Sequence, residues 1–165
     1  MLDFLQEWLI PIRWVHVIAG SLWIGEVVVI NFILIPVLSK YEGENRKLFL
    51  TSIFPKIFTL ASVLSATAVI TGLIQVLTIT NGNLDILTEN RWGISILIGG
   101  SLAIILTLFH FFMENRLAKK IGIGVTQSDD EALAEVHLKL KIVPRVGLGV
   151  ITLIFFLMMF AVRGI

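Results

Sequence analysis

Three histidines are the only imidazoles in a chain of 165 residues that contains no cysteine. Thiolate sites, thiol catalysis and disulfides are therefore excluded, and a metal centre has to use His, Met, Asp or Glu. Ala19, Gly20 and Trp23 follow His16 at spacings of three, four and seven, so they share its face of a helix. Small residues beside a histidine leave a flat slot for a haem whose iron the imidazole binds. Close helix packing around a hydrogen-bonded histidine is the alternative.

Two methionines near the other end of the chain offer a second ligand. Met158 and Met159 come four or five residues before Arg163, which places them at about the depth of His16 if both segments span a membrane in opposite directions. A His and Met pair suits a haem iron or a soft Cu(I) ion. The alternative is that the methionines fill gaps in apolar packing.

A second candidate metal site lies around His110. By helical rise it is about 25 Å from His16, so the two histidines do not share one metal within a protomer. Met113 and Glu114 follow His110 at spacings of three and four, and His137 lies on the next polar segment. A copper site at the inner surface is one interpretation, and a histidine at the membrane interface without a metal is the other.

Glu26 is an acidic residue within an apolar stretch, midway between Arg13 and Lys40. A charged carboxylate at the centre of a bilayer is unfavourable by about 2.5–3.5 kcal/mol, so Glu26 is expected to face the bundle interior and to be neutral at pH 7. Thr67 and Ser101 lie at similar depth and are the expected hydrogen-bond partners. Glu26 either joins helices or takes part in proton transfer or cofactor contact.

The elements that position these residues are four long apolar blocks. With 56% hydrophobic residues, 15% charged residues and a mean hydropathy of +0.93, the chain is far more apolar than soluble domains are. Each block is long enough to cross about 30 Å of hydrocarbon as a helix. The sequence predicts an all-α, single-domain membrane bundle with helices over about 8–38, 54–79, 92–113 and 142–162.

Polar segments connect these blocks. A charged loop is expected near 39–47, a polar turn near 80–90, and a loop over 114–141. Ser128 and Glu131 have the spacing of a capping box, so a helical extension is expected to begin near 129 and to bend at Pro144. The first block is expected to be a retained helix, because it is longer than the apolar region of a signal peptide.

The basic residues are distributed unequally between the two sides of the expected bundle. Arg13, Arg91 and Arg163 fall on one side. The other ten of the 13 Lys and Arg residues share the opposite side: Lys40, Arg46, Lys47, Lys56, Arg116, Lys119, Lys120, Lys139, Lys141 and Arg145. The positive-inside rule then predicts both termini outside the cytoplasm. Since topology accounts for the basic residues and the net charge is only +1, nucleic acid is not an expected partner.

The order of these features resembles the CopD-like copper-resistance membrane domain and, more distantly, the HemJ-type protoporphyrinogen oxidases. The similar residues span nearly the whole chain: His16, Trp23 and Gly25 in HVIAGSLWIG, then 46–49, Thr71 and Gly72, Gly93, and Asn115 with Arg116. The first-helix pattern also resembles the membrane part of the cytochrome-linked urate oxidases. The resemblance implies a haem b or copper site that involves His16.

This sequence departs from the related families at two points. Gly99 stands where they often have a basic residue in the third helix, and the Leu-Pro-Arg of the oxidase family is missing from the first helix. These departures disfavour protoporphyrinogen oxidase activity.

Three functions remain open. The first is a multi-pass cell-membrane cytochrome that binds haem b and transfers electrons from a quinol or another redox protein, with a homodimer required for bis-histidine ligation. The second is a CopD-like copper carrier with His16 and His110 in separate sites. The third is a non-catalytic scaffold subunit of a membrane complex.

Overall fold

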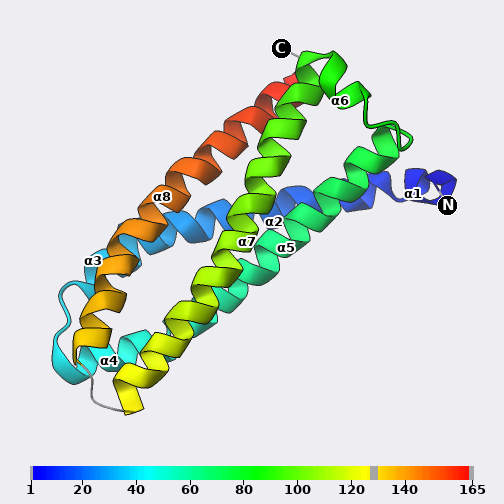
Figure 1. The fold of residues 1–165 in the computed structure, drawn as a ribbon. Helices are drawn as coiled ribbons and strands as arrows, with labels where there is room; N and C mark the ends of the chain where they lie inside the picture. The colour runs from blue at the N-terminus through cyan, green and yellow to red at the C-terminus, as the bar shows by residue number, and fades with distance from the viewer. Residues whose placement is uncertain (1, 127–129, 164–165) are drawn as a thin grey trace.

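The computed structural model describes residues 2–126 and 130–163, and it is an all-α four-helix membrane bundle (Figure 1). Four of its segments are long and apolar enough to cross a bilayer: Leu9–Leu38, Gly43–Ile79, Arg91–Met113 and Ile142–Val162. In hydrocarbon, backbone N–H and C=O groups have no water to bond, so an apolar chain satisfies them within helices. The predicted fold class is confirmed.

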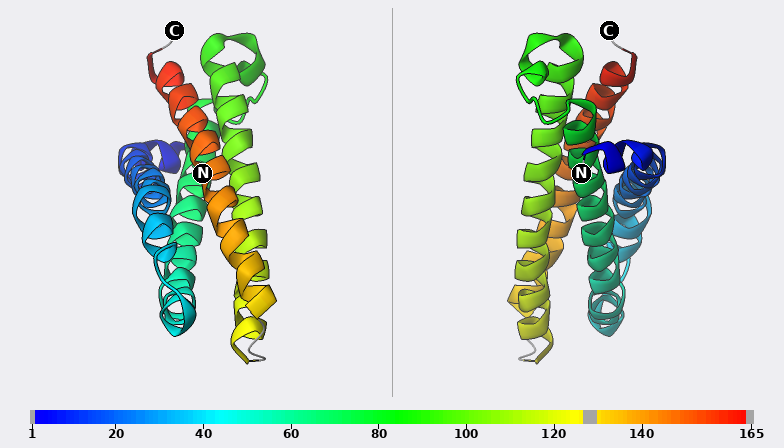
Figure 2. Two further views of the ribbon diagram at one scale, coloured as in Figure 1. Left: turned by 90° about the vertical axis from the view of Figure 1, so that its left-hand side faces the viewer. Right: turned by 90° about the vertical axis from the view of Figure 1, so that its right-hand side faces the viewer.

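The bundle consists of two helix pairs. Helix α2 (Leu9–Val29) packs mainly on α5 (Phe54–Ile79), and α7 (Arg91–Thr126) packs mainly on α8 (Asp130–Arg163). Figure 2 shows the pairs as two layers, and in Figure 1 they diverge from the end that holds α4 (Gly43–Ser52). Helix α1 (Leu2–Glu7) and α6 (Ile86–Glu89) lie at the other ends of these pairs. The two ends are called here the α4 end and the α6 end.

Two clusters of buried side chains join the pairs. Near the α4 end, Leu38, Leu50, Phe54 and Phe58 pack together and contact Met113 of α7. Farther toward the α6 end, all four long helices contribute to a second cluster, formed by Ala19, Trp23, Ala68 and Ile151 with Ile24, Val27, Leu64, Leu106 and Leu148 around it. Both predicted site histidines lie beside one of these clusters, as described below.

The first span contains a π-helical turn that the sequence pattern did not predict. The π-helix η1 (Ile30–Leu34) separates α2 from α3 (Ile35–Leu38). Pro36 lacks a backbone N–H, so the regular bond to the carbonyl four residues earlier is lost there. Asn31 strengthens the irregular turn, because its Nδ2 donates to the Val27 carbonyl at 2.8 Å and to the Pro144 carbonyl of α8 at 2.9 Å. The second of these bonds connects the π-helical turn to α8 at Pro144.

Two of the expected connections are more helical than predicted. The stretch expected to be a charged loop forms α4 in its second half, because Leu50 is fully buried against Leu38 and Phe54. The loop expected over 114–141 is also wrong in extent, since α7 continues to Thr126. The helical extension expected from about 129 is confirmed, because α8 begins at Asp130. A helix need not end where the membrane does, and Leu, Ala and Lys are good helix formers. The capping residue proposed at Ser128 lies outside the described residues.

The turn that follows α5 at the α6 end contains two residues with positive φ. Asn81 and Gly82 have φ values of +51° and +79°, the left-handed conformation that ends helices. The Gly82 N–H donates to the Leu77 carbonyl at 3.0 Å, which closes the last turn of α5. Helix α7 then begins against α6, and the Gly93 N–H donates to the Asn90 side chain at 2.8 Å.

Candidate functional site

His16 is a residue of α2, and its imidazole lies against α5, whose backbone holds it. The distance from Nδ1 to the Ala68 carbonyl oxygen is 2.8 Å. A carbonyl only accepts hydrogen bonds, so Nδ1 carries the proton and donates it. In the neutral ring, Nε2 then has the free lone pair, which is the arrangement found in metal-binding histidines. No described residue forms a hydrogen bond with Nε2.

Two further residues of α5 surround the His16 ring. Thr71 Oγ1 lies 3.4 Å from Nδ1, but its shorter contact is the 2.6 Å bond that it donates to the Thr67 carbonyl. The ring packs directly on Gly72, where an ideal Cβ would be 3.0 Å from Cε1. A larger residue at this position would push the ring away by a few tenths of an ångström. Sequence reasoning did not assign Ala68, Thr71 or Gly72 to the site, although Thr71 and Gly72 belong to the resemblance.

The small residues beside His16 differ in what they contact. Ala19 and Trp23 are each only 4% exposed and pack against Ala68 and Ile151, so close packing fills this part of the expected slot. A Cβ at Gly20, in contrast, would meet nothing within 4 Å. The open side of the His16 region is therefore next to Gly20.

The two methionines of α8 do not share one environment. The Met158 methyl lies against α7, 2.9 Å from an ideal Cβ at Gly99. The side chain of Met159 is 40% exposed. In residues 2–126 and 130–163, so far as their side chains are described, no group of three or more His, Asp or Glu residues could hold a metal ion. The contacts of Met158 are those of a side chain that fills a gap beside a glycine.

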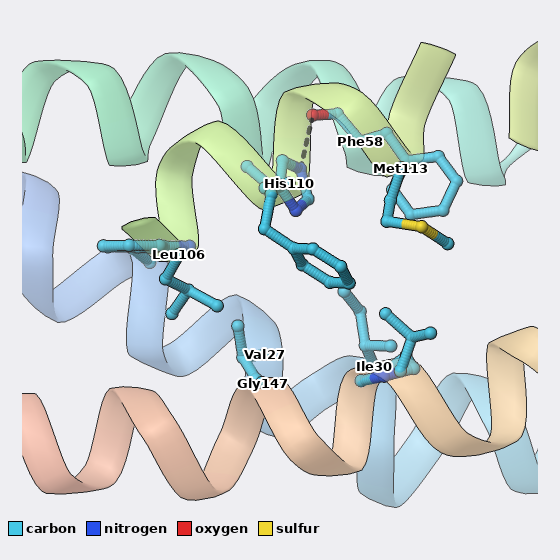
Figure 3. Close-up of a pocket in the computed structure, with 12 residues that line it drawn as sticks. Val27, Ile30, Phe58, Leu106, His110, Met113 and Gly147 are labelled. Carbon is cyan, nitrogen blue, oxygen red and sulfur yellow. Dashed lines mark hydrogen bonds between the residues drawn. The ribbon is translucent and has the colours of Figure 1, made fainter. Parts of the chain in front are cut away.

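His110 lies at a cavity of about 70 Å³ between the two buried clusters (Figure 3). Its Nε2 is 3.4 Å from the Phe58 carbonyl, and its ring meets the Phe58 ring edge-on at 6.0 Å. The cavity wall comes from all four spans: Trp23, Val27, Ile30, Phe58, Ala61, Leu106, Phe109, His110, Met113, Val143, Pro144 and Gly147. The side chains of Glu114 and His137, named with His110 as an inner site, lie outside the described residues.

Glu26 is not bonded to the partners expected from its depth. Both of its carboxyl oxygens are buried, and neither has a hydrogen-bond partner in the part of the chain that the structure describes. Thr67 instead donates to the Val63 carbonyl at 2.7 Å, and Ser101 is exposed. Hydroxyls in helices bond readily to the carbonyl four residues earlier, so a similar depth did not make Thr67 a partner.

Comparison with known proteins finds no matching family, no matching curated protein and no matching solved structure. The fold defines an integral membrane protein, in which the His16 imidazole is oriented by a backbone carbonyl of the neighbouring helix.

Proposed function

We propose that this protein is a small membrane cytochrome of the b type, in which Nε2 of His16 is an axial ligand of haem b. The observation that carries the proposal is the 2.8 Å bond from Nδ1 to the Ala68 carbonyl. It fixes both the tautomer and the direction of the ring, which is what partners beyond the ligand do at metal sites. Histidine is also uncommon in membrane spans without a function.

The surroundings of His16 are compatible with one axial ligand from this chain. Gly72 and Gly20 leave the ring close to α5 on one side and next to open space on the other. The bound haem would supply one-electron redox chemistry. The chain would hold the imidazole in place and keep its Nδ1–H hydrogen-bonded to the Ala68 carbonyl. A second histidine would come from a partner copy in a homodimer.

The proposed partners follow from the membrane location. A quinol in the bilayer or another redox protein is the proposed electron donor, and the cell membrane is the proposed location. Copper binding at His16 and a scaffold role are the alternatives that the test below separates.

The absorption spectrum of the purified protein tests this function. Protein expressed with ample haem and purified in mild detergent is expected to show a Soret band and reducible α and β bands. Metal analysis on the same sample distinguishes iron from copper. Copper in proportion to protein, without a Soret band, would contradict the cytochrome and support the copper carrier. Neither metal in a folded protein would support the scaffold role.

The proposed orientation places the α4 end in the cytoplasm. The chain has no native cysteine, so single cysteines at the exposed positions Glu44, Asn83 and Lys119 give three clean reporters. In intact cells, Glu44→Cys and Lys119→Cys are expected to react only with thiol reagents that cross membranes, because the basic ends of membrane spans stay inside. Asn83→Cys, at the α6 end, is expected to react with impermeant reagents. The reverse labelling pattern would show that the bundle is inverted.

A further inference from the structure

The buried polar atoms that lack partners belong to residues one helical turn from residues that line the cavity between the two clusters. The buried side-chain atoms without a hydrogen bond in residues 2–126 and 130–163, where side chains are described, are both carboxyl oxygens of Glu26, Asn31 Oδ1 and Thr107 Oγ1. Each of these residues is three or four positions from a cavity-lining residue and so shares its helix face: Glu26 with Trp23 and Ile30, Asn31 with Val27, and Thr107 with His110. Such groups are unfavourable in a dry interior.

The cavity has the size needed to hydrate these groups. Its volume is about 70 Å³, and one water molecule needs about 10–15 Å³ of such space. Trp23 and Val27, the cavity residues on either side of Glu26 along α2, bring the backbone of Glu26 to the cavity edge. Because a glutamate side chain has three rotatable bonds, a change of rotamer can direct its carboxyl either into apolar packing or toward the cavity.

We infer that Glu26 is a proton-binding site in the interior of the membrane, which exchanges its proton with water in this cavity. The neutral carboxylic acid rests in the packed position, where no charge has to be stabilised. When the proton leaves for a water molecule, the carboxylate turns toward the hydrated cavity, where Asn31 and Thr107 lie at the margin. The step moves one proton and breaks no other bond.

Other charged groups lie around this site at different distances. His110 of α7 is the titratable side chain in the cavity wall. On the helices packed against α2, the described basic groups are Lys56 of α5 and Lys139 and Arg145 of α8, all toward the α4 end. His16 is ten residues from Glu26 on its own helix, about 15 Å by helical rise. No described group forms an ion pair with Glu26.

Infrared spectroscopy of the full chain in lipid nanodiscs tests this inference without haem. The wild-type protein is expected to show the carbonyl stretch of a protonated carboxylic acid that disappears as pH rises and shifts to lower wavenumber in D₂O. Glu26→Gln is expected to fold and to lack this band. If Glu26→Gln does not fold, Glu26→Asp keeps a carboxyl and is expected to move the band.

Two glycines of α8 provide a matched pair of variants that tests whether the Glu26 proton exchanges through the cavity. A Cβ at Gly147 or at Gly149 would meet nothing within 4 Å, but only Gly147 lines the cavity. In Gly147→Val, the rate at which the band shifts in D₂O is therefore expected to fall severalfold. In Gly149→Val, this exchange rate is expected to equal that of the wild type.

Three results would overturn the inference. The first is a wild-type spectrum without any band that depends on Glu26, which means that the group stays ionised. The second is a band that never exchanges in D₂O, which means that the acid is sealed and only joins helices. The third is equal exchange in Gly147→Val and Gly149→Val, which removes the cavity as the route. None of these readouts depends on a haem, so the cytochrome proposal stands or fails separately.

Discussion

His16→Ala protein is expected to lose the Soret band or to show it strongly shifted, while it keeps its helical circular dichroism. The axial ligand sets both the binding and the spin state of a haem iron, so its removal has the largest effect on the spectrum that any single change in this chain offers. The measurement is the ratio of Soret to protein absorbance in variants purified side by side. His16→Gly protein supplied with imidazole is expected to regain part of the band, because the free base replaces the missing ring.

His110→Ala is the matched control for this experiment. Like His16, His110 is a half-buried histidine near a carbonyl of α5, in this case that of Phe58 at 3.4 Å. Its variant is expected to keep the wild-type spectrum. A spectrum lost in His110→Ala and kept in His16→Ala would place the ligand at the cavity and contradict the assignment.

Gly93→Ala is expected to destabilise the bundle more than other small substitutions in this chain. An ideal Cβ at Gly93 would lie 2.5 Å from the Leu87 Cα and 2.6 Å from the Ile86 carbonyl oxygen. Both contacts are with backbone atoms, which have no rotamer to change, so α6 would have to move away from α7. Forcing a methyl group into such a site is unfavourable by about 1–3 kcal/mol or more. The measurement is the unfolding temperature in detergent.

Gly100→Ala on the same helix is the control for Gly93→Ala. A Cβ at Gly100 would meet nothing within 4 Å, and alanine is the better helix former by about 1 kcal/mol. The unfolding temperature of this variant is therefore expected to stay the same or to rise. If both variants melted like the wild type, the contact of α6 with α7 would be looser than the distances indicate.

The architecture could be predicted from the sequence because one strong physical constraint determines it. Apolar runs of sufficient length form helices in hydrocarbon, and the second run forms α5 over Phe54–Ile79 as expected. Details that depend on contacts between helices could not be predicted in this way. The π-helical turn involves Asn31 and the Pro144 carbonyl, 113 residues apart in the sequence. Likewise, α4 forms because Leu50 is buried against Leu38 of α3 and Phe54 of α5.

The candidate site could be predicted only in part, for a related reason. His16 is visible as a polar ring in an apolar stretch, but the group that orients it is the backbone carbonyl of Ala68, and a backbone atom leaves no signal in residue type. Gly72 is visible as a glycine, yet only the structure shows that the His16 ring occupies the space of its missing side chain. For Glu26, depth alone did not identify the surroundings, because Thr67 at the same depth is already bonded within its own helix and Ser101 is exposed.

The π-helical turn in the first span also determines which side chains reach the α4 end. Ile30 and Ile35 are both buried although they are five residues apart, a spacing that would turn them about 140° away from each other in a regular α-helix. The wider turn absorbs one residue and returns Ile35 and Leu38 to the buried face. In evolutionary terms the bulge corresponds to a single-residue insertion. A relative without it would align with a one-residue gap near Asn31, and the buried pattern on either side of the gap would be continuous.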